Sequence, residues 1–95
     1  MGQRERLSAE EVATRLRDVP GWTQDGDAIV RAFTFGDFQE AFGFLTRVAL
    51  ITEVLDHHAE IWNVWNQVKL TFSTHDAGGL TEKDFEAALK INEVA

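Results

Sequence analysis

The sequence contains no cysteine, which excludes disulfides, cysteine nucleophiles and metal sites built from thiolates. No stretch of it approaches the roughly 20 consecutive apolar residues of a membrane-spanning helix, so membrane insertion is not expected. The polar segment 1–6 is followed by no apolar stretch, so we expect no secretory signal and a cytoplasmic protein. The formal net charge is −7 and Lys and Arg form no basic stripe. Binding to a nucleic-acid backbone is therefore not expected.

The residues that are present are typical of a folded globule. Of the 95 residues, 44% are hydrophobic, and they include seven Phe and three Trp. A chain of this length makes one domain, so we expect residues 1–95 to form a single unit.

Three helices are predicted, the first from Ser8 to Pro20, the second from about Asp37 to about Asp56 and the third from Thr81 onward. Ser8 and Glu11 have the spacing of a capping box, in which each residue satisfies a backbone N–H of the other. Asp37 and Glu40 repeat that spacing. The dipeptide Pro20-Gly21 ends the first helix.

Segments rich in β-forming residues lie between the helices. Trp22–Gln24 and Ala28–Phe35 flank Asp25-Gly26-Asp27, and an Asp-Gly pair is a strong signal for a tight turn. A further strand is predicted from about Asn63 to Thr74, where apolar and polar residues alternate from Val68 onward. The resulting order is α-β-β-α-β-α, which predicts an α+β domain with helices on one face of an antiparallel sheet.

The predicted second helix is apolar on more than one face. The residues that we expect to face the sheet are Phe38, Ala41, Phe42, Leu45, Val48, Ala49 and Thr52. The apolar residues off that stripe are Phe44, Ile51, Val54 and Leu55. A helix that is apolar over two faces buries both. We therefore expect a homo-oligomer with Phe44, Ile51 and Leu55 at a subunit contact.

The chain has three histidines, in two short segments that end regular elements. His57 and His58 close the predicted second helix, and His75 follows the last predicted strand. The acids beside them are Glu53, Asp56 and Asp76. Imidazole gives and takes protons near neutral pH at little cost. The cluster predicts proton-transfer chemistry on a small polar substrate.

Charge and spacing suggest roles for these histidines. The dipole of a helix favours an imidazolium near its C-terminal end, so His57 or His58 suits a general acid. His75, beside Asp76, suits a base, and the roles within the adjacent pair stay open. A zinc site is disfavoured, because adjacent histidines rarely converge on one ion and helical ligands favour i, i+4 spacing.

Three other residues have a structural interpretation that we prefer. Asp84 could reach the histidines, but it falls at the third position of a helix, where an acid is favoured anyway. Trp62 and Trp65 could stack on a flat ligand, but aromatic residues in a small domain belong more often to a core or an interface.

Several segments together resemble the pterin-4a-carbinolamine dehydratase family. They are Leu7–Glu11 with Gly21-Trp22, Phe35–Phe44, Thr46–Leu50, Asp56-His57-His58 with Glu60, Asn63–Asn66 and Ser73–Thr81. The similarity covers about Leu7 to Ala95. Its most specific part is the histidine pair combined with the turn Thr74–Leu80.

The resemblance implies three helices packed on one face of a four-stranded antiparallel sheet. It implies a hydro-lyase that dehydrates 4a-hydroxytetrahydrobiopterin to quinonoid dihydropterin in tetrahydrobiopterin recycling, with no metal or organic cofactor. It also implies dimers or tetramers, the tetramers built through the helix 37–56. The implied catalytic residues are His57, His58 and His75, and the implied substrate contacts are Glu53, Asp56, Ala59, Thr74, Asp76 and Ala77.

The alternative is a non-catalytic protein on the same fold. Relatives of the fold act as dimerisation cofactors of a homeodomain transcription factor or resemble assembly chaperones. Members that only bind tend to lose the histidines, whereas this chain keeps all three. The enzyme is therefore the preferred hypothesis.

Overall fold

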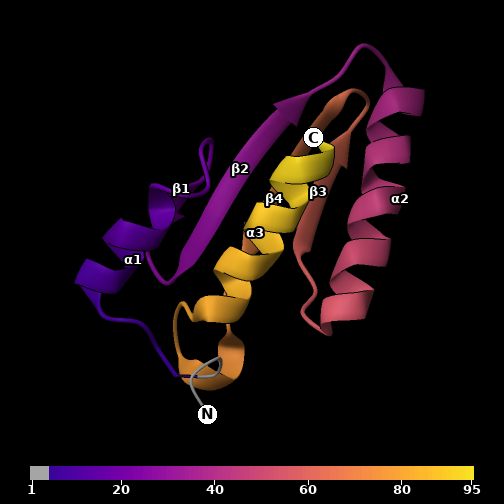
Figure 1. The fold of residues 1–95 in the computed structure, drawn as a ribbon. Coiled ribbons are helices and arrows are strands. Elements are labelled where there is room, and N and C mark those ends of the chain that lie inside the picture. The colour runs from indigo at the N-terminus through magenta and orange to yellow at the C-terminus, as the bar shows by residue number, and fades with distance from the viewer. Residues whose placement is uncertain (1–4) are drawn as a thin grey trace.

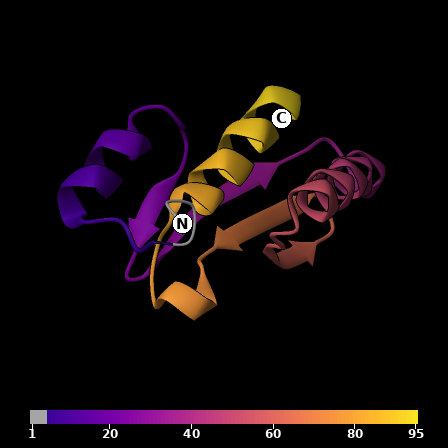
Figure 2. The ribbon, with the colours of Figure 1, turned by 60° about the horizontal axis from the view of Figure 1, so that its bottom comes forward.

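A computed structural model describes residues 5–95 as a four-stranded antiparallel sheet with three α-helices on one side of it, as Figure 1 and Figure 2 show. The elements in chain order are α1 (Ala9–Leu16), β1 (Thr23–Asp25), β2 (Ala28–Thr34), α2 (Phe38–Leu55), β3 (Glu60–Val64), β4 (Gln67–Phe72), a 3₁₀ helix η2 (His75–Ala77) and α3 (Glu82–Val94). The strands lie in the order β1-β2-β4-β3. The predicted α+β class is confirmed. No helix in this part of the chain has the length and apolar character needed to cross a membrane.

The strand expected over residues 63–74 is in fact a hairpin. β3 and β4 are antiparallel, and Val64 pairs with Gln67 across the turn Trp65-Asn66. Trp65 has a φ of 50°. This left-handed conformation is usually occupied by glycine, so the sequence contains no signal for it here. The side-chain amide of Asn63 holds the turn by donating to the carbonyl oxygens of Trp65 (3.2 Å) and Gln67 (2.9 Å). Because neither Gly nor Pro marks this turn, the pattern indicated one strand.

The core lies between the sheet and the helices. Its buried strand residues are Ile29, Phe33, Val68, Leu70 and Phe72, and its buried helix residues include Val12, Ala41, Leu45, Val48, Phe85, Ala88 and Ile91. The alternation predicted from Val68 onward is therefore confirmed. Burial on this side of β4 fixes which face of the sheet the helices cover.

The prediction for the faces of α2 is wrong at three phenylalanines and at Ala49, which is expected to face the sheet but is exposed. Phe44, expected at a subunit contact, is 0% exposed and packs in the core against the rings of Phe33 (4.7 Å between centroids) and Phe35 (5.0 Å). Phe38 and Phe42, expected to face the sheet, are about half exposed. The predicted stripe and the stripe that is buried in the structure both have helical spacing and share several residues, so periodicity alone could not choose between them.

The helix starts follow the predicted caps, with one correction. Ser8 and Glu11 form the full capping box. The Asp37 carboxylate accepts from the N–H of Glu40 (2.8 Å), but the Glu40 carboxylate accepts from the N–H of Gly36 (2.8 Å) instead of returning to Asp37. The reciprocal half of that predicted box is therefore absent.

Candidate functional site

The two adjacent histidines leave α2 through a tight C-terminal turn. Asp56 adopts a left-handed conformation with a φ of 53°, which a short polar side chain tolerates better than most. The N–H of Asp56 donates to the carbonyl of Glu53 (3.1 Å), and the N–H of His57 donates to that of Thr52 (3.0 Å). This is the hydrogen-bond pattern of a Schellman motif. After this turn the two imidazoles lie in different environments: the His57 side chain is 11% exposed, whereas that of His58 is 59% exposed.

His57 is held between a carboxylate and an aromatic ring. Its Nε2 lies 2.5 Å from Oδ1 of Asp84, and its ring stacks on Phe72 with centroids 5.8 Å apart and planes 11° apart. A carboxylate offers only acceptors, so Nε2 carries the hydrogen and donates it. In the neutral ring, Nδ1 is then the nitrogen with a free lone pair. The surroundings of His57 therefore fix one tautomer and one orientation.

Asp84 is fully buried and connects three parts of the chain. Its Oδ2 accepts from the N–H of Thr81 (2.9 Å) and from the hydroxyl of Thr74 (2.9 Å), while Oδ1 faces His57. The hydroxyls of Thr74 and Thr81 lie 2.7 Å apart. A buried carboxylate is costly unless it is hydrogen-bonded, and three donors converge on this one. The start of α3, the segment that follows β4 and the end of α2 thus meet at the side chain of Asp84.

The loop with the third histidine begins at Thr74. His75, Asp76 and Ala77 form η2, and Thr74 pairs with Gly79 in an isolated β-bridge that closes the loop. In Figure 1 the C-terminal end of α2, η2 and the start of α3 all lie at the lower end of the molecule. Since His57 and Thr74 both contact Asp84, the two histidine segments converge there. The imidazole of His75 is exposed at this end.

The remaining predicted site residues surround this centre. Nε2 of His58 lies 2.7 Å from Oε1 of Glu53, both on the surface. Asp56 and Asp76 are exposed, and Ala59 and Ala77 are half-buried. Thr74 differs from the rest, because its hydroxyl contacts Asp84 and Thr81 while its backbone N–H and carbonyl are bonded within the loop.

The two tryptophans considered as stacking platforms are both exposed. Trp62 pairs with Lys69 across the β3–β4 hairpin. Lys69 is exposed whereas its neighbours Val68 and Leu70 are buried, so Trp62 and Lys69 point to the sheet face away from the helices. His57 stacks on Phe72, which is buried on the helix side. A ligand held at His57 is therefore separated from Trp62 by the sheet.

One contact of α3, between Asp84 and His57, is disfavoured by the sequence, and another is missed. Asp84 forms a capping box with Thr81, as expected for an acid at that position of a helix. The same carboxylate also orients His57. Lys83 donates from Nζ to the carbonyl of Leu55 (3.0 Å) at the end of α2. The Thr-x-x-Asp spacing was the available signal for the cap; contacts with residues 27 and 28 positions away follow only from the fold. Within residues 5–95, no three His, Cys, Asp or Glu side chains are grouped so that they could hold a metal ion.

The fold and the site together define a small α+β protein with a carboxylate-oriented histidine at a helix end. Residues 5–94 match the model of the family described as pterin 4 alpha carbinolamine dehydratase. Two proteins named "Putative pterin-4-alpha-carbinolamine dehydratase" are similar to it. The one from Bradyrhizobium sp. (strain ORS 278) is 56% identical over 96% of this chain and 93% of its own length, and the one from Burkholderia multivorans is 52% identical over 95% and 90%.

A solved structure is similar throughout. The crystal structure of a transcriptional coactivator/pterin dehydratase from Brucella melitensis matches with a TM-score of 0.92 and 43% identity, over 96% of this chain and 99% of that one. The chain belongs to the pterin-4-alpha-carbinolamine dehydratase family.

Proposed function

We propose that this chain is a hydro-lyase that converts 4a-hydroxytetrahydrobiopterin, a pterin-4a-carbinolamine, into quinonoid dihydropterin and water in tetrahydrobiopterin recycling. The proposal takes residues 1–95 as a single dehydratase-like domain. The observation that carries it is the contact between His57 and the buried Asp84, which is joined through Thr74 to the loop that bears His75. Family membership supports the substrate class, and the oriented imidazole supports acid–base chemistry.

The reaction needs two proton transfers. A proton leaves a ring N–H, the electrons of that bond form a C=N bond to the neighbouring carbon, and the C–O bond of that carbon breaks. In our proposal Nδ1 of His57 takes the proton, because Asp84 engages Nε2 as a donor. The imidazolium that forms is stabilised by the buried carboxylate beside it, as in other carboxylate–histidine pairs.

The leaving hydroxyl must receive a proton to depart as water. We propose that the exposed imidazoles, His58 and His75, supply it. This reverses the roles suggested by the sequence for His57 and His75, because Asp84 leaves Nδ1 of His57 as the nitrogen that can accept a proton. The proposed substrate contacts around them are Glu53, Asp56, Ala59, Asp76 and Ala77. Thr74 has its polar groups bonded within the protein, so we propose that it holds Asp84 and the loop instead of binding substrate.

The test is turnover of chemically generated 4a-hydroxytetrahydropterin, measured against its spontaneous dehydration. We expect the wild-type protein to accelerate the reaction with and without EDTA, because proton transfer between imidazoles and substrate suffices. Glu86→Gln, an exposed change on α3, should behave as the wild type, and His57→Ala should not. A wild-type protein that fails to exceed the spontaneous rate would contradict the proposal.

One observation favours a second candidate function, a non-catalytic dimerisation cofactor or assembly protein. The exposed side of α2 carries Phe38, Phe42, Leu50 and Val54, and the similar Brucella protein is named a transcriptional coactivator as well as a pterin dehydratase. An apolar patch of this kind on a small protein marks an interaction surface. We propose that α2 makes homo-oligomer contacts in either case. The turnover assay distinguishes the two functions, because only the dehydratase accelerates the reaction above its spontaneous rate.

A further inference from the structure

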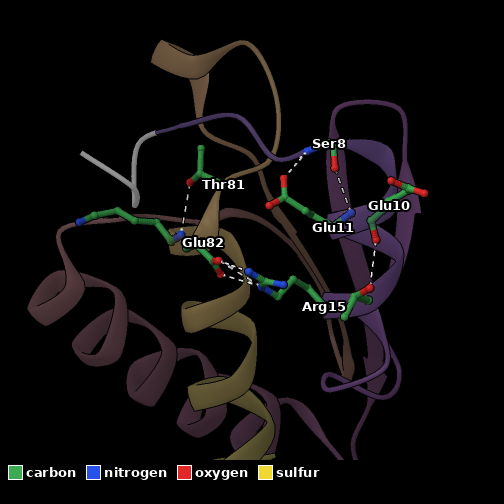
Figure 3. A network of polar contacts seen from close by, with 8 residues as sticks. Ser8, Glu10, Glu11, Arg15, Thr81 and Glu82 are labelled. Carbon is green, nitrogen blue, oxygen red and sulfur yellow. Dashed lines mark hydrogen bonds and ion pairs between the residues drawn. The ribbon is translucent and has the colours of Figure 1, made fainter.

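An ion pair that involves none of the histidines links the first and last helices. Nε of Arg15 on α1 donates to Oε1 (2.9 Å) and Oε2 (3.2 Å) of Glu82, and Nη2 of Arg15 also contacts Oε2. Figure 3 shows this two-pronged contact reaching across from α1 to the first residue of α3. The hydrogen bond from Arg15 holds the pKa of Glu82 below its usual value. A bidentate arrangement fixes the direction as well as the distance between its partners.

The same stretch of chain touches the start of α3 at a second point. The N–H of Leu7 donates to the carbonyl of Leu80 (2.8 Å). Leu80 is buried. Residues 7–15 therefore contact the chain on both sides of Thr81, the N-cap of α3. The first turn of a helix frays most easily, and these two contacts restrain it from the side of α1.

That restrained turn carries the residues that orient His57. Thr81 donates its N–H to Asp84 (2.9 Å), and Asp84 accepts from Nε2 of His57 (2.5 Å). Glu82 lies between Thr81 and Asp84 in the same turn. An unbroken series of contacts therefore runs from Arg15 through Glu82 and the α3 turn to His57.

We propose that Arg15 is a positioning residue for the imidazole of His57, acting through Glu82 and the first turn of α3. The inference rests on the proposed function for its kinetic consequence, but not for its structural one. The Arg15 and Glu82 side chains are 32% and 37% exposed, and exposed ion pairs add little to overall stability. We expect the Arg15–Glu82 pair to affect the position of His57 more than the stability of the fold, because a general base works only in a narrow range of positions.

The test compares Arg15→Gln and Glu82→Gln with Arg17→Gln, a matched loss of an exposed arginine from the end of the same helix. The first readout is the proton NMR signal of Nε2–H of His57, which reports its hydrogen bond to Asp84 without any turnover. We expect both variants of the pair to shift or broaden this signal, and Arg17→Gln to leave it unchanged. An unchanged signal in Arg15→Gln would overturn the proposal.

The second readout is the dehydration rate. We expect Arg15→Gln to lower kcat by about tenfold with little change in KM, since small misplacements of a catalytic group cost up to about 100-fold. Arg15→Lys should recover part of the loss, and the double variant should be no worse than either single one, because both remove the same contact. A loss that matches only the unfolded fraction, or additive losses, would count against positioning. A wild-type protein without turnover would refute the proposed function, and the NMR comparison would still decide the positioning.

Discussion

Replacing Asp84 by asparagine tests how the site sets the state of His57. The change keeps the size and shape of the side chain but turns one acceptor oxygen into an N–H donor. Three groups now depend on acceptors there: the N–H of Thr81, the hydroxyl of Thr74 and Nε2–H of His57. The Thr74 hydroxyl can reverse its role, whereas the backbone N–H of Thr81 cannot. The amide oxygen of the introduced asparagine should therefore face Thr81, and its amide nitrogen should face His57.

That orientation forces the wrong tautomer. Nε2 of His57 would have to accept, the hydrogen would move to Nδ1, and the nitrogen proposed as the base would lose its lone pair. Carboxylate-to-amide changes in comparable pairs reduce turnover by roughly 10⁴-fold. Asp84 is fully buried, so its hydrogen bonds do not compete with solvent. We expect Asp84→Asn to lose roughly 10²–10⁴-fold in kcat.

Stability should fall as well, but by a bounded amount. Losing a buried, charge-assisted hydrogen bond costs roughly 1.5–3 kcal/mol. For a domain of this size, 1 kcal/mol moves Tm by roughly 4–8 °C. The assay is kcat and Tm for the wild type, Asp84→Asn and Glu86→Gln, all measured well below the lowest Tm. If Asp84→Asn keeps wild-type turnover, or loses it only as it unfolds, the carboxylate does not set the tautomer and the reasoning is refuted.

Three further predictions use other parts of the structure. His58→Ala and His75→Ala should each lower turnover by roughly 10²–10⁴-fold and leave Tm nearly unchanged, and the double variant should fall far short of additive losses if they act in one pocket; full activity in either variant would exclude that residue from catalysis. Light scattering at micromolar protein should give a mass above the 10.7 kDa of one chain, and Leu50→Glu on the exposed side of α2 should reduce it; a monomeric wild type would contradict the helix contact. Arg15 lowers the pKa of Glu82 from its usual 4.5. The stability that Glu82 contributes is therefore present above that pH and lost as pH falls through the lowered value. Chemical unfolding should show the wild type more stable than Glu82→Gln at pH 7 and the difference shrinking below about pH 4.5; a difference that persists at low pH would show that the charge is not responsible.

The features predicted correctly from the sequence are those specified by neighbouring residues. Ser8 with Glu11 marks the first helix because a capping box is made by side chains three positions apart. The Gly26-Asp27 turn joins β1 and β2 because Gly26 adopts a φ of 61° at little cost. The two histidine segments could be placed at the ends of elements for the same reason.

The features that were missed depend on residues distant in the chain. Phe44 and Phe42 occupy overlapping helical stripes, and which of them enters the core is decided by Phe33 and Phe35 on and after β2. Asp84 lies where a helix favours an acid in any case. Only the packing of α3 against the end of α2 shows that its second oxygen has another partner.

The start of α3 serves the helix and the site at once. Thr81 and Asp84 cap the helix, and the backbone N–H of Thr81 and the hydroxyl of Thr74 hold the Asp84 carboxylate that orients His57. The site therefore cannot form before α3 has begun, and a change at any of these three positions should cost stability and turnover together. The exposed imidazole of His75 is free of that coupling. This separates Thr74, Thr81, Asp84 and the His57 that they orient, where activity and stability should fall in parallel, from the exposed His58 and His75, where activity should fall alone.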